Sequence, residues 1–326
     1  MRVFITGGSG FVGQNVIPVL KGKGYAVVGL ARSAEAASKL EKVGAVPIMD
    51  DLTNLSQVTA DALRHCDFVV HSAARMELDY NKEKFFEINV GATKKLLSLS
   101  KKNGVKKFIY ISAAPVIPGS PVINAKESDV GIGLPKALYP RTKAIAEKWV
   151  LSSNTKDFQT ISLRPPLIWG PNNHHVHEIM DRVNSGKWMW IGGGRQILST
   201  VHIRNLAEAI LLALETKESG KPYFITDGDR RPMRETFEKL FEVYGLDAGK
   251  KEFPLSVANF MARVFHTVWT VLGLKSQPPV PPLAIRLMAR EFSVSDAKAR
   301  QELGYQNVLS FEEGLMDLKT RLKIEK

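Results

Sequence analysis

The chain has 326 residues, of which 44% are apolar and 24% charged, and a net charge of +12. This length predicts one large α/β domain with a smaller second part, and the composition excludes collagen-like, disordered and small disulfide-stapled proteins. A single cysteine, Cys66, excludes an intrachain disulfide, and the scattered basic residues form no nucleic-acid motif, so no nucleic-acid partner is expected.

Short apolar runs alternate with amphipathic segments along the first half. Strands are expected at 3–6, 26–31, 45–49, 68–72 and 107–112, and helices at 14–23, 34–43, 58–66 and 83–103. Strands that are apolar at nearly every position are typical of a parallel sheet covered on both faces. The pattern therefore predicts an α/β fold with a doubly wound parallel sheet.

The loop between the first strand and the first helix reads TGGSGFVG, from Thr6 to Gly13. Glycines three residues apart allow a tight turn, close approach of a pyrophosphate and packing of the helix on the sheet, and the helix N-terminus attracts phosphate. This context predicts a Rossmann-type dinucleotide site. The residues expected to bind the dinucleotide are Gly7, Ser9, Gly10, Phe11, Val12 and Gly13.

The end of the second strand distinguishes NAD from NADP. An acidic residue there would bind the 2′-hydroxyl of NAD, but the position is Ala31, and Arg32 follows it. An arginine accepts the 2′-phosphate of NADP. The sequence therefore predicts NADP, with NAD bound without a carboxylate as the open alternative.

Tyr139 and Lys143 stand four residues apart at the start of an expected helix at 139–152, so they share one face. A nearby ammonium favours phenolate and lowers the pKa of a tyrosine. The phenol then exchanges a proton with an alcohol or ketone while a nicotinamide exchanges hydride. The pair predicts an oxidoreductase with Tyr139 as the general acid/base.

With these motifs the chain resembles the extended short-chain dehydrogenase/reductases, which include nucleotide-sugar epimerases and 3β-hydroxysteroid dehydrogenases, and the latter branch is the more similar. The segments 163–171 and 296–305 extend the resemblance over nearly the whole chain. It implies that Lys143 also holds the nicotinamide ribose. Further cofactor contacts are implied for Asp51 and Leu52 at the adenine, and for Ser72, Ala73, Ala74, Asn89, Pro166 and Ile168.

The third catalytic group is where the chain departs from this family. The family places a Ser or Thr just beyond the fifth strand, where this chain has Ala113, and Ser112 stands one residue early. Ser112 itself, Thr142 or a water molecule would have to polarise the substrate carbonyl. A dinucleotide-binding protein without catalysis is the alternative that this departure leaves open.

The second half is less regular. Strands are expected at 160–163 and 223–226, and helices at 206–216, 234–244 and 296–303, the last capped by Ser295. The dinucleotide-binding domain is expected to cover 1–165, with returning segments near 197–228. A substrate-binding region is expected to cover 166–196 and 229–326.

The substrate is expected to be apolar. Sugar-nucleotide epimerases carry Arg-Asp where this chain has Leu198 and Ser199, although an epimerase or dehydratase remains the alternative. Trp188 and Trp190 would form an apolar wall of the substrate site or pack in the core. We therefore predict an NAD(P)-dependent enzyme that interconverts a secondary alcohol and a ketone on a sterol-like substrate.

The segment 255–274 has apolar residues three and four apart, and is interpreted as a core helix, a lid or an interfacial membrane helix. Prolines between 277 and 282 favour extended backbone. No signal peptide or membrane span is expected, so the protein should be cytoplasmic, with membrane association through 255–274 left open. The resemblance also suggests a homodimer. His174, His175 and His177 are placed in a loop whose spacing matches no zinc site, so no metal is expected.

Overall fold

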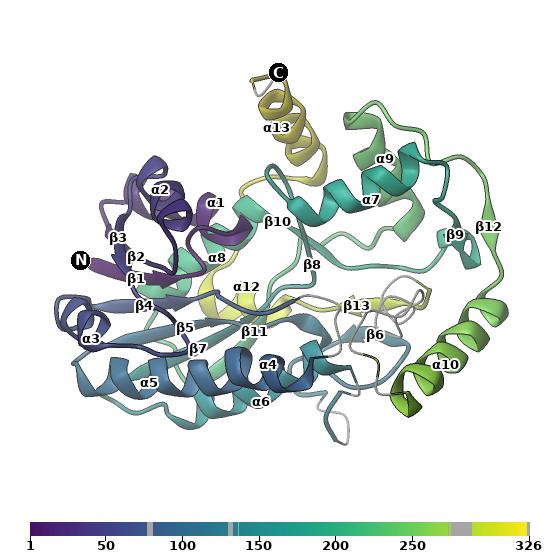
Figure 1. Ribbon diagram of the computed structural model, residues 1–326. Helices are drawn as coiled ribbons and strands as arrows, with labels where there is room; N and C mark the ends of the chain where they lie inside the picture. The colour runs from purple at the N-terminus through teal and green to yellow at the C-terminus, as the bar shows by residue number, and fades with distance from the viewer. Residues whose placement is uncertain (77–80, 130–132, 136, 273, 275–288, 325–326) are drawn as a thin grey trace.

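The computed structural model describes residues 1–76, 81–129, 133–135, 137–272, 274 and 289–324. A seven-stranded parallel sheet forms the centre of the larger part of the molecule, in the order β11-β7-β5-β4-β1-β2-β3 (Figure 1). The strands are β1 (Arg2–Thr6), β2 (Ala26–Ala31), β3 (Val46–Met49), β4 (Phe68–His71), β5 (Lys107–Ile111), β7 (Gln159–Arg164) and β11 (Lys221–Phe224). The expected doubly wound sheet is confirmed. Its order reverses between β1 and β4, and open parallel sheets bind ligands at such a point.

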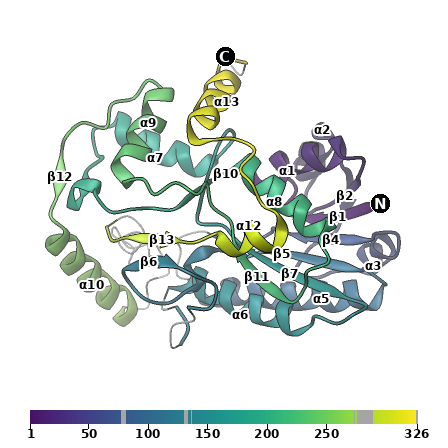
Figure 2. The ribbon, with the colours of Figure 1, turned by 180° about the vertical axis from the view of Figure 1, so that it is seen from behind.

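Helices cover both faces of the sheet, as the two ribbon views show (Figures 1 and 2). One face carries α1 (Phe11–Gly22), α2 (Ala34–Lys42), α8 (Ile203–Glu215) and α12 (Ala297–Leu303), and the other α3 (Gln57–Arg64), α5 (Thr93–Lys102) and α6 (Leu138–Ser152). Successive strand residues alternate between the two cores: Val3 and Ile5 pack on the α1 side, and Phe4 on the α6 side. Burial on both faces explains why these strands are apolar throughout.

Three helix predictions need correction. The helix expected at 83–103 is α4 (Lys82–Phe86), a π-helical turn at Glu87–Ala92 and then α5. The helix expected at 296–303 is α12, which begins at Ala297. Its N-cap position is occupied by Asp296 and not by Ser295. The histidines placed in a loop begin α7 (His174–Asn184), which buries Met180 and Val183.

Three two-stranded parallel pairs form a second part, which is built mainly from the chain after β7. They are β8 (Leu167–Trp169) with β10 (Thr200–His202), β9 (Trp190–Ile191) with β12 (Glu252–Phe253), and β13 (Phe292–Val294) with β6 (Val122–Ala125). Around them lie α7, α9 (Met233–Val243), α10 (Leu255–Val271) and α13 (Phe311–Ile324). The domain boundary at 165 stays a prediction, and the prolines at 277–282 lie outside the described residues.

Trp188 and Trp190 belong to the core of this second part. Both are buried, with ring centroids 5.4 Å apart, and Trp188 also contacts Phe237 and Phe241 of α9. The structure therefore supports the interpretation of these rings as core residues.

A buried carboxylate fastens the two parts together. Asp227, just after β11, accepts hydrogen bonds from Trp169 Nε1 (2.7 Å) and Thr200 Oγ1 (2.9 Å) with one oxygen. Its other oxygen accepts from the backbone N–H of His202 (2.7 Å) and from Asn205 Nδ2 (2.8 Å). Four donors on one buried carboxylate hold β8, β10 and α8 to the edge of the sheet.

Candidate active site

The glycine loop packs directly on the segment that follows β4. Thr6 and His71 are paired in the register of β1 and β4, so both loops leave the same edge of the sheet. Gly7 has a φ of +71°, and a Cβ there would lie 2.7 Å from the backbone nitrogen of Ala73 and 2.8 Å from Ser72 Oγ. Gly7 is therefore required both by its conformation and by the close approach of the two loops.

The first turn of α1 fits a diphosphate. Gly10 occupies the N-cap position and brings no side chain to the first-turn N–H groups, which include those of Phe11 and Val12. A Cβ on Gly13 would lie 2.3 Å from the Cα of Gly8, so only glycine allows the helix to start this close to the loop. Ser9, which stands between Gly8 and Gly10, is half-buried. Free N–H groups at a helix N-terminus suit the phosphates of a dinucleotide.

The expected adenosine end lies at the carboxyl edge of β2 and β3. Arg32 is exposed directly after β2, and the next residue, Ser33, caps α2 by accepting the N–H of Ala36. Hydrogen bonds from Thr53, and then the positive charge of Arg32, lower the pKa of the Asp51 carboxyl. Leu52 packs beside the core on the α3 side. The structure thus brings Arg32, Asp51 and Leu52 to one edge, while their roles toward a cofactor stay predictions.

Tyr139 and Lys143 lie one turn apart on α6, with Tyr139 half-buried and Lys143 fully buried. Lys143 Nζ donates a hydrogen bond to the Ile111 carbonyl at the end of β5 (2.5 Å) and lies 4.2 Å from the centre of the Tyr110 ring. Burial lowers the pKa of Lys143 to about 7, an effect that Glu147 opposes. Burial also raises the pKa of Tyr139 well above its usual value. Burial of the phenol acts against the lowering expected from Lys143, and that expectation stays a prediction.

A buried ion pair continues the same face of α6, and the sequence analysis missed it. Glu147 follows Lys143 by one turn, and Arg164 of β7 donates to it from Nη2 (2.6 Å) and Nε (2.9 Å). Ser162 Oγ donates to the same carboxylate at 2.7 Å. Tyr139, Lys143 and Glu147 have a spacing of four that could have signalled this extended polar face.

The predicted third catalytic group is sought among Ser112 and Thr142, because Ala113 has no polar side chain. Ser112 Oγ is buried and, among the described residues, has no hydrogen-bond partner; Ala113 is buried beside it. Thr142 donates its hydroxyl proton to the Tyr139 carbonyl (2.9 Å) and accepts from Asn89 Nδ2 (3.0 Å). That hydroxyl is therefore engaged within the protein, which leaves Ser112 as the side-chain candidate.

Asn89 lies in the π-helical turn and is buried. Besides its bond to Thr142, its Oδ1 accepts the N–H of Arg75 (2.7 Å) and its Nδ2 donates to the Arg75 carbonyl (3.1 Å). Both ends of the amide thus bind protein groups, and its predicted contact with a cofactor stays a prediction. The predicted cofactor contacts of Ala74, Pro166 and Ile168, which are half-buried, also stay predictions.

No group of three His, Cys, Asp or Glu residues suited to a metal ion occurs in the part of the chain that the structure describes. The side chains of His174, His175 and His177 lie outside that part.

Comparison with known proteins gives consistent matches. A model of the 3-beta hydroxysteroid dehydrogenase/isomerase family matches residues 4–255. A 4-hydroxy-2-methyl-3-oxo-4-farnesyl-3,4-dihydroquinoline-1-oxide ketoreductase of Stigmatella aurantiaca is 33% identical, over 97% of this chain and 95% of its own. A decarboxylating sterol-4-alpha-carboxylate 3-dehydrogenase of Dictyostelium discoideum is 31% identical, over 97% and 99% of the two chains.

Among solved structures, MoeE5 in complex with UDP-glucuronic acid and NAD superposes with a TM-score of 0.76. The identity is 20%, and all of both chains is covered. At this identity the likeness concerns the fold.

Proposed function

The chain belongs to the 3-beta hydroxysteroid dehydrogenase/isomerase family of extended short-chain dehydrogenase/reductases and is an NAD(P)-dependent oxidoreductase, and from this premise we propose that it reduces a ketone on a large apolar substrate with NADPH. The observation that carries the proposal is the pairing of Tyr139 with the buried Lys143 on α6, beside the end of β5. The reverse oxidation of the secondary alcohol would use the same groups.

The protonation state of Tyr139 suits a proton donor in the reduction. The raised pKa of Tyr139 keeps its phenol protonated at neutral pH, so Tyr139 would donate this proton to the ketone oxygen. A bound nicotinamide dinucleotide would supply the hydride. Lys143, when protonated, would stabilise the phenolate that remains, and the Ile111 carbonyl would hold its ammonium in place. Ser112 is the side chain that we assign to polarise the carbonyl.

The preference for NADPH is proposed from Arg32. No carboxylate stands directly after β2, and Arg32 is exposed beside the capped start of α2. Arg32→Ala should weaken NADPH binding about tenfold, as for loss of one charge-assisted contact, and leave NADH binding unchanged. Fluorescence titration with both nucleotides tests this. Equal losses for NADPH and NADH would contradict the role.

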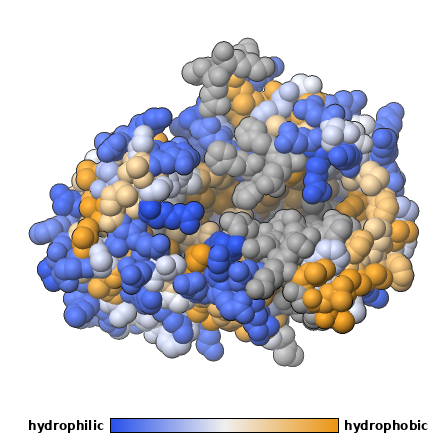
Figure 3. All heavy atoms as spheres, in the orientation of Figure 1, coloured by the Kyte–Doolittle hydropathy of each residue, from blue (hydrophilic) through white to orange (hydrophobic). Residues whose placement is uncertain are grey.

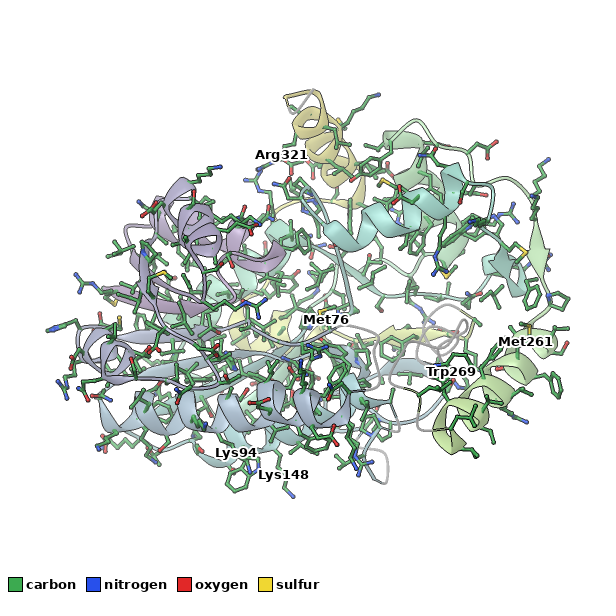
Figure 4. The ribbon with its side chains drawn as sticks, in the orientation of Figure 1. Met76, Lys94, Lys148, Met261, Trp269 and Arg321 are labelled. Atoms are coloured by element: carbon green, nitrogen blue, oxygen red, sulfur yellow. The ribbon has the colours of Figure 1, made fainter. Side chains whose placement is uncertain are left out.

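An apolar substrate is supported by the relatives and by the surface. One relative is a ketoreductase for a farnesylated quinoline and another a dehydrogenase for a sterol carboxylate. Met76, labelled in Figure 4, and Leu167 are 46% and 38% exposed, and they follow the carboxyl ends of β4 and β7. Leu198 and Ser199, where epimerases would carry Arg-Asp, are both buried and offer no charge to a sugar diphosphate.

Absorbance at 340 nm tests the reaction with a 3-ketosterol, a farnesylated 3-oxoquinoline and UDP-glucose, each with NADPH and NADH. Turnover of an apolar ketone is expected, and turnover of the nucleotide sugar alone would overturn the substrate class. Tyr139→Phe should lower kcat by roughly 10²–10⁴-fold with NADPH affinity unchanged. Tyr25→Phe, a tyrosine in the core on the α1 side, is the matched control and should keep full activity. Normal turnover by Tyr139→Phe would refute the assignment.

We also propose that α10 binds the surface of an anionic membrane. Phe260, Val264, Val268 and Val271 form an apolar stripe on α10 and are 67%, 42%, 39% and 76% exposed. The covered side of α10 presents Ala258, with Ala262 next to it in the same small core. Figure 3 shows the resulting hydrophobic patch, and Figure 4 labels Met261 and Trp269 on the same helix.

Charge around α10 favours anionic lipid over a second copy of this basic chain. Residues 253–290 contain no Asp or Glu but four Lys or Arg, including the exposed Arg263. The bounding acids, Glu252 and Glu291, are paired with Arg234 (3.3 Å) and Arg230 (3.0 Å). No helix in the described residues is long and apolar enough to cross a bilayer, so α10 would lie in the interface plane.

Flotation with vesicles tests this contact. The whole protein should bind vesicles that contain phosphatidylglycerol, and it should bind vesicles of pure phosphatidylcholine much more weakly. Phe260→Asp should weaken binding at least about tenfold, since a large apolar side chain is lost from the interface. Met316→Asp, at a position 64% exposed on α13, is the matched control and should bind normally. Equal binding by both variants, or a dimer that Phe260→Asp dissociates without any vesicle binding, would overturn the proposal.

A further inference from the structure

His71, at the end of β4, joins two elements of the candidate site through buried hydrogen bonds. The ring is fully buried, with its centroid 5.9 Å from that of Phe108 and 5.6 Å from that of Tyr110. Its Nδ1 lies 2.6 Å from the hydroxyl oxygen of Thr6, and its Nε2 lies 2.8 Å from that of Thr93. Thr6 ends β1 just before the glycine loop, and Thr93 begins α5 just after the π-helical turn. The imidazole therefore connects the two.

The direction of each hydrogen bond follows from the other partners of the two threonines. Thr93 donates its hydroxyl proton to the Asn89 carbonyl (2.8 Å), so its oxygen accepts a proton from His71 Nε2. Nδ1 then carries no proton and accepts that of Thr6, whose oxygen accepts the N–H of Ala73 (3.3 Å). A neutral ring with its proton on Nε2 satisfies all of these bonds. Burial, with the charge of Lys143, lowers the pKa of His71 to about 3, in agreement with a neutral ring.

The connection continues from α5 to the catalytic helix. Asn89, whose carbonyl accepts from Thr93, donates from Nδ2 to Thr142 Oγ1 (3.0 Å). Thr142 in turn donates to the backbone carbonyl of Tyr139 (2.9 Å). Each group between Thr6 and Tyr139 thus has a defined donor or acceptor role. Such a fully satisfied buried network holds its elements in one arrangement.

We infer that His71 is a positioning residue, which holds α5 and its π-helical turn against the end of β1 and thereby sets where α6 presents Tyr139 relative to the glycine loop. The inference rests on the proposed function for its kinetic consequence. A proton donor misplaced by about 1 Å loses on the order of 10²-fold in rate, so the network would act on kcat more than on cofactor affinity.

Thr93 offers the matched pair of variants for the kinetic test. Thr93→Val keeps the shape and removes the hydroxyl, so His71 Nε2 and the Asn89 carbonyl lose their shared partner. We expect kcat for ketone reduction to fall at least about tenfold while the Kd of NADPH changes less than threefold. Thr93→Ser restores the hydroxyl and should restore kcat to within twofold. If Thr93→Val lowers the melting temperature but leaves kcat unchanged well below it, the role is merely structural and the inference is overturned.

The tautomer gives a test without catalysis. Nitrogen NMR of the whole chain labelled with 15N-histidine, assigned by the signal missing from His71→Gln, should show a neutral His71 with its proton on Nε2 from pH 5 to 8. A proton on Nδ1, or titration within this range, would overturn the inference. An Nε2 proton together with failure of every ketone substrate would count against the proposed reaction, while the hydrogen-bond arrangement would stand.

Discussion

The helix α6, which carries Tyr139 and Lys143, and the outer helix α10 have similar lengths, 15 and 17 residues, but they are held in opposite ways. Polar side chains of α6, among them Thr142, Lys143 and Glu147, are buried and bonded to partners on β5, β7 and the π-helical turn. The covered side of α10 is held by apolar packing around Ala258 and Ala262. Directional bonds fix one geometry, whereas apolar contacts tolerate substitution. We therefore expect substitutions on α6 to cost more stability than substitutions on the covered side of α10.

The largest loss of stability is expected from breaking the buried ion pair between Glu147 of α6 and Arg164. Glu147→Gln leaves Arg164 buried with a neutral partner, and breaking such a pair costs about 3–5 kcal/mol of stability. Urea unfolding measures this loss. Glu35→Gln, which breaks the exposed pair with Lys39 (2.7 Å), is the control and should cause no measurable loss. Equal behaviour of the two variants would remove the distinction between α6 and the surface.

A second test concerns the glycine loop, which packs on the segment after β4. Gly13→Ala brings a Cβ within 2.3 Å of backbone, so we expect a loss of about 1–3 kcal/mol and a weaker affinity for NADPH. Gly22→Ala, at the other end of α1, meets nothing within 4 Å and should be neutral or stabilising by up to about 1 kcal/mol. Thermal unfolding and nucleotide titration measure both. A stable Gly13→Ala that binds NADPH normally would contradict the close packing.

The smallest effect is a pH dependence that sharpens the role of Lys143. Its pKa is lowered to about 7, so the charge that stabilises the phenolate is present below this pH and is lost as pH rises through it. We expect kcat/KM for ketone reduction to fall up to tenfold per pH unit above about pH 7. Lys143→Arg keeps its charge and should lose this decline, even if kcat is lower. A flat profile for the native protein from pH 6 to 9 would contradict the role.

Local spacing in the sequence determined the strands, the glycine loop and the Tyr139–Lys143 pair, because each depends on backbone sterics or on the period of one element. The π-helical turn at Glu87–Ala92 and the start of α7 at His174 were not predicted, since neither has a distinct local pattern. The four-residue spacing of Tyr139, Lys143 and Glu147 can be seen in the sequence, but the ion-pair partner of Glu147 cannot.

Only the tertiary structure decided which polar groups meet. His71 joins Thr6, 65 residues earlier, to Thr93, 22 residues later, and Arg164 reaches Glu147 from another strand. It likewise decided that Phe260 of α10 is exposed while Trp190 is in the core. Such pairings depend on how elements far apart in the chain pack. Desolvation in that packing also raises the pKa of Tyr139 and lowers that of Lys143.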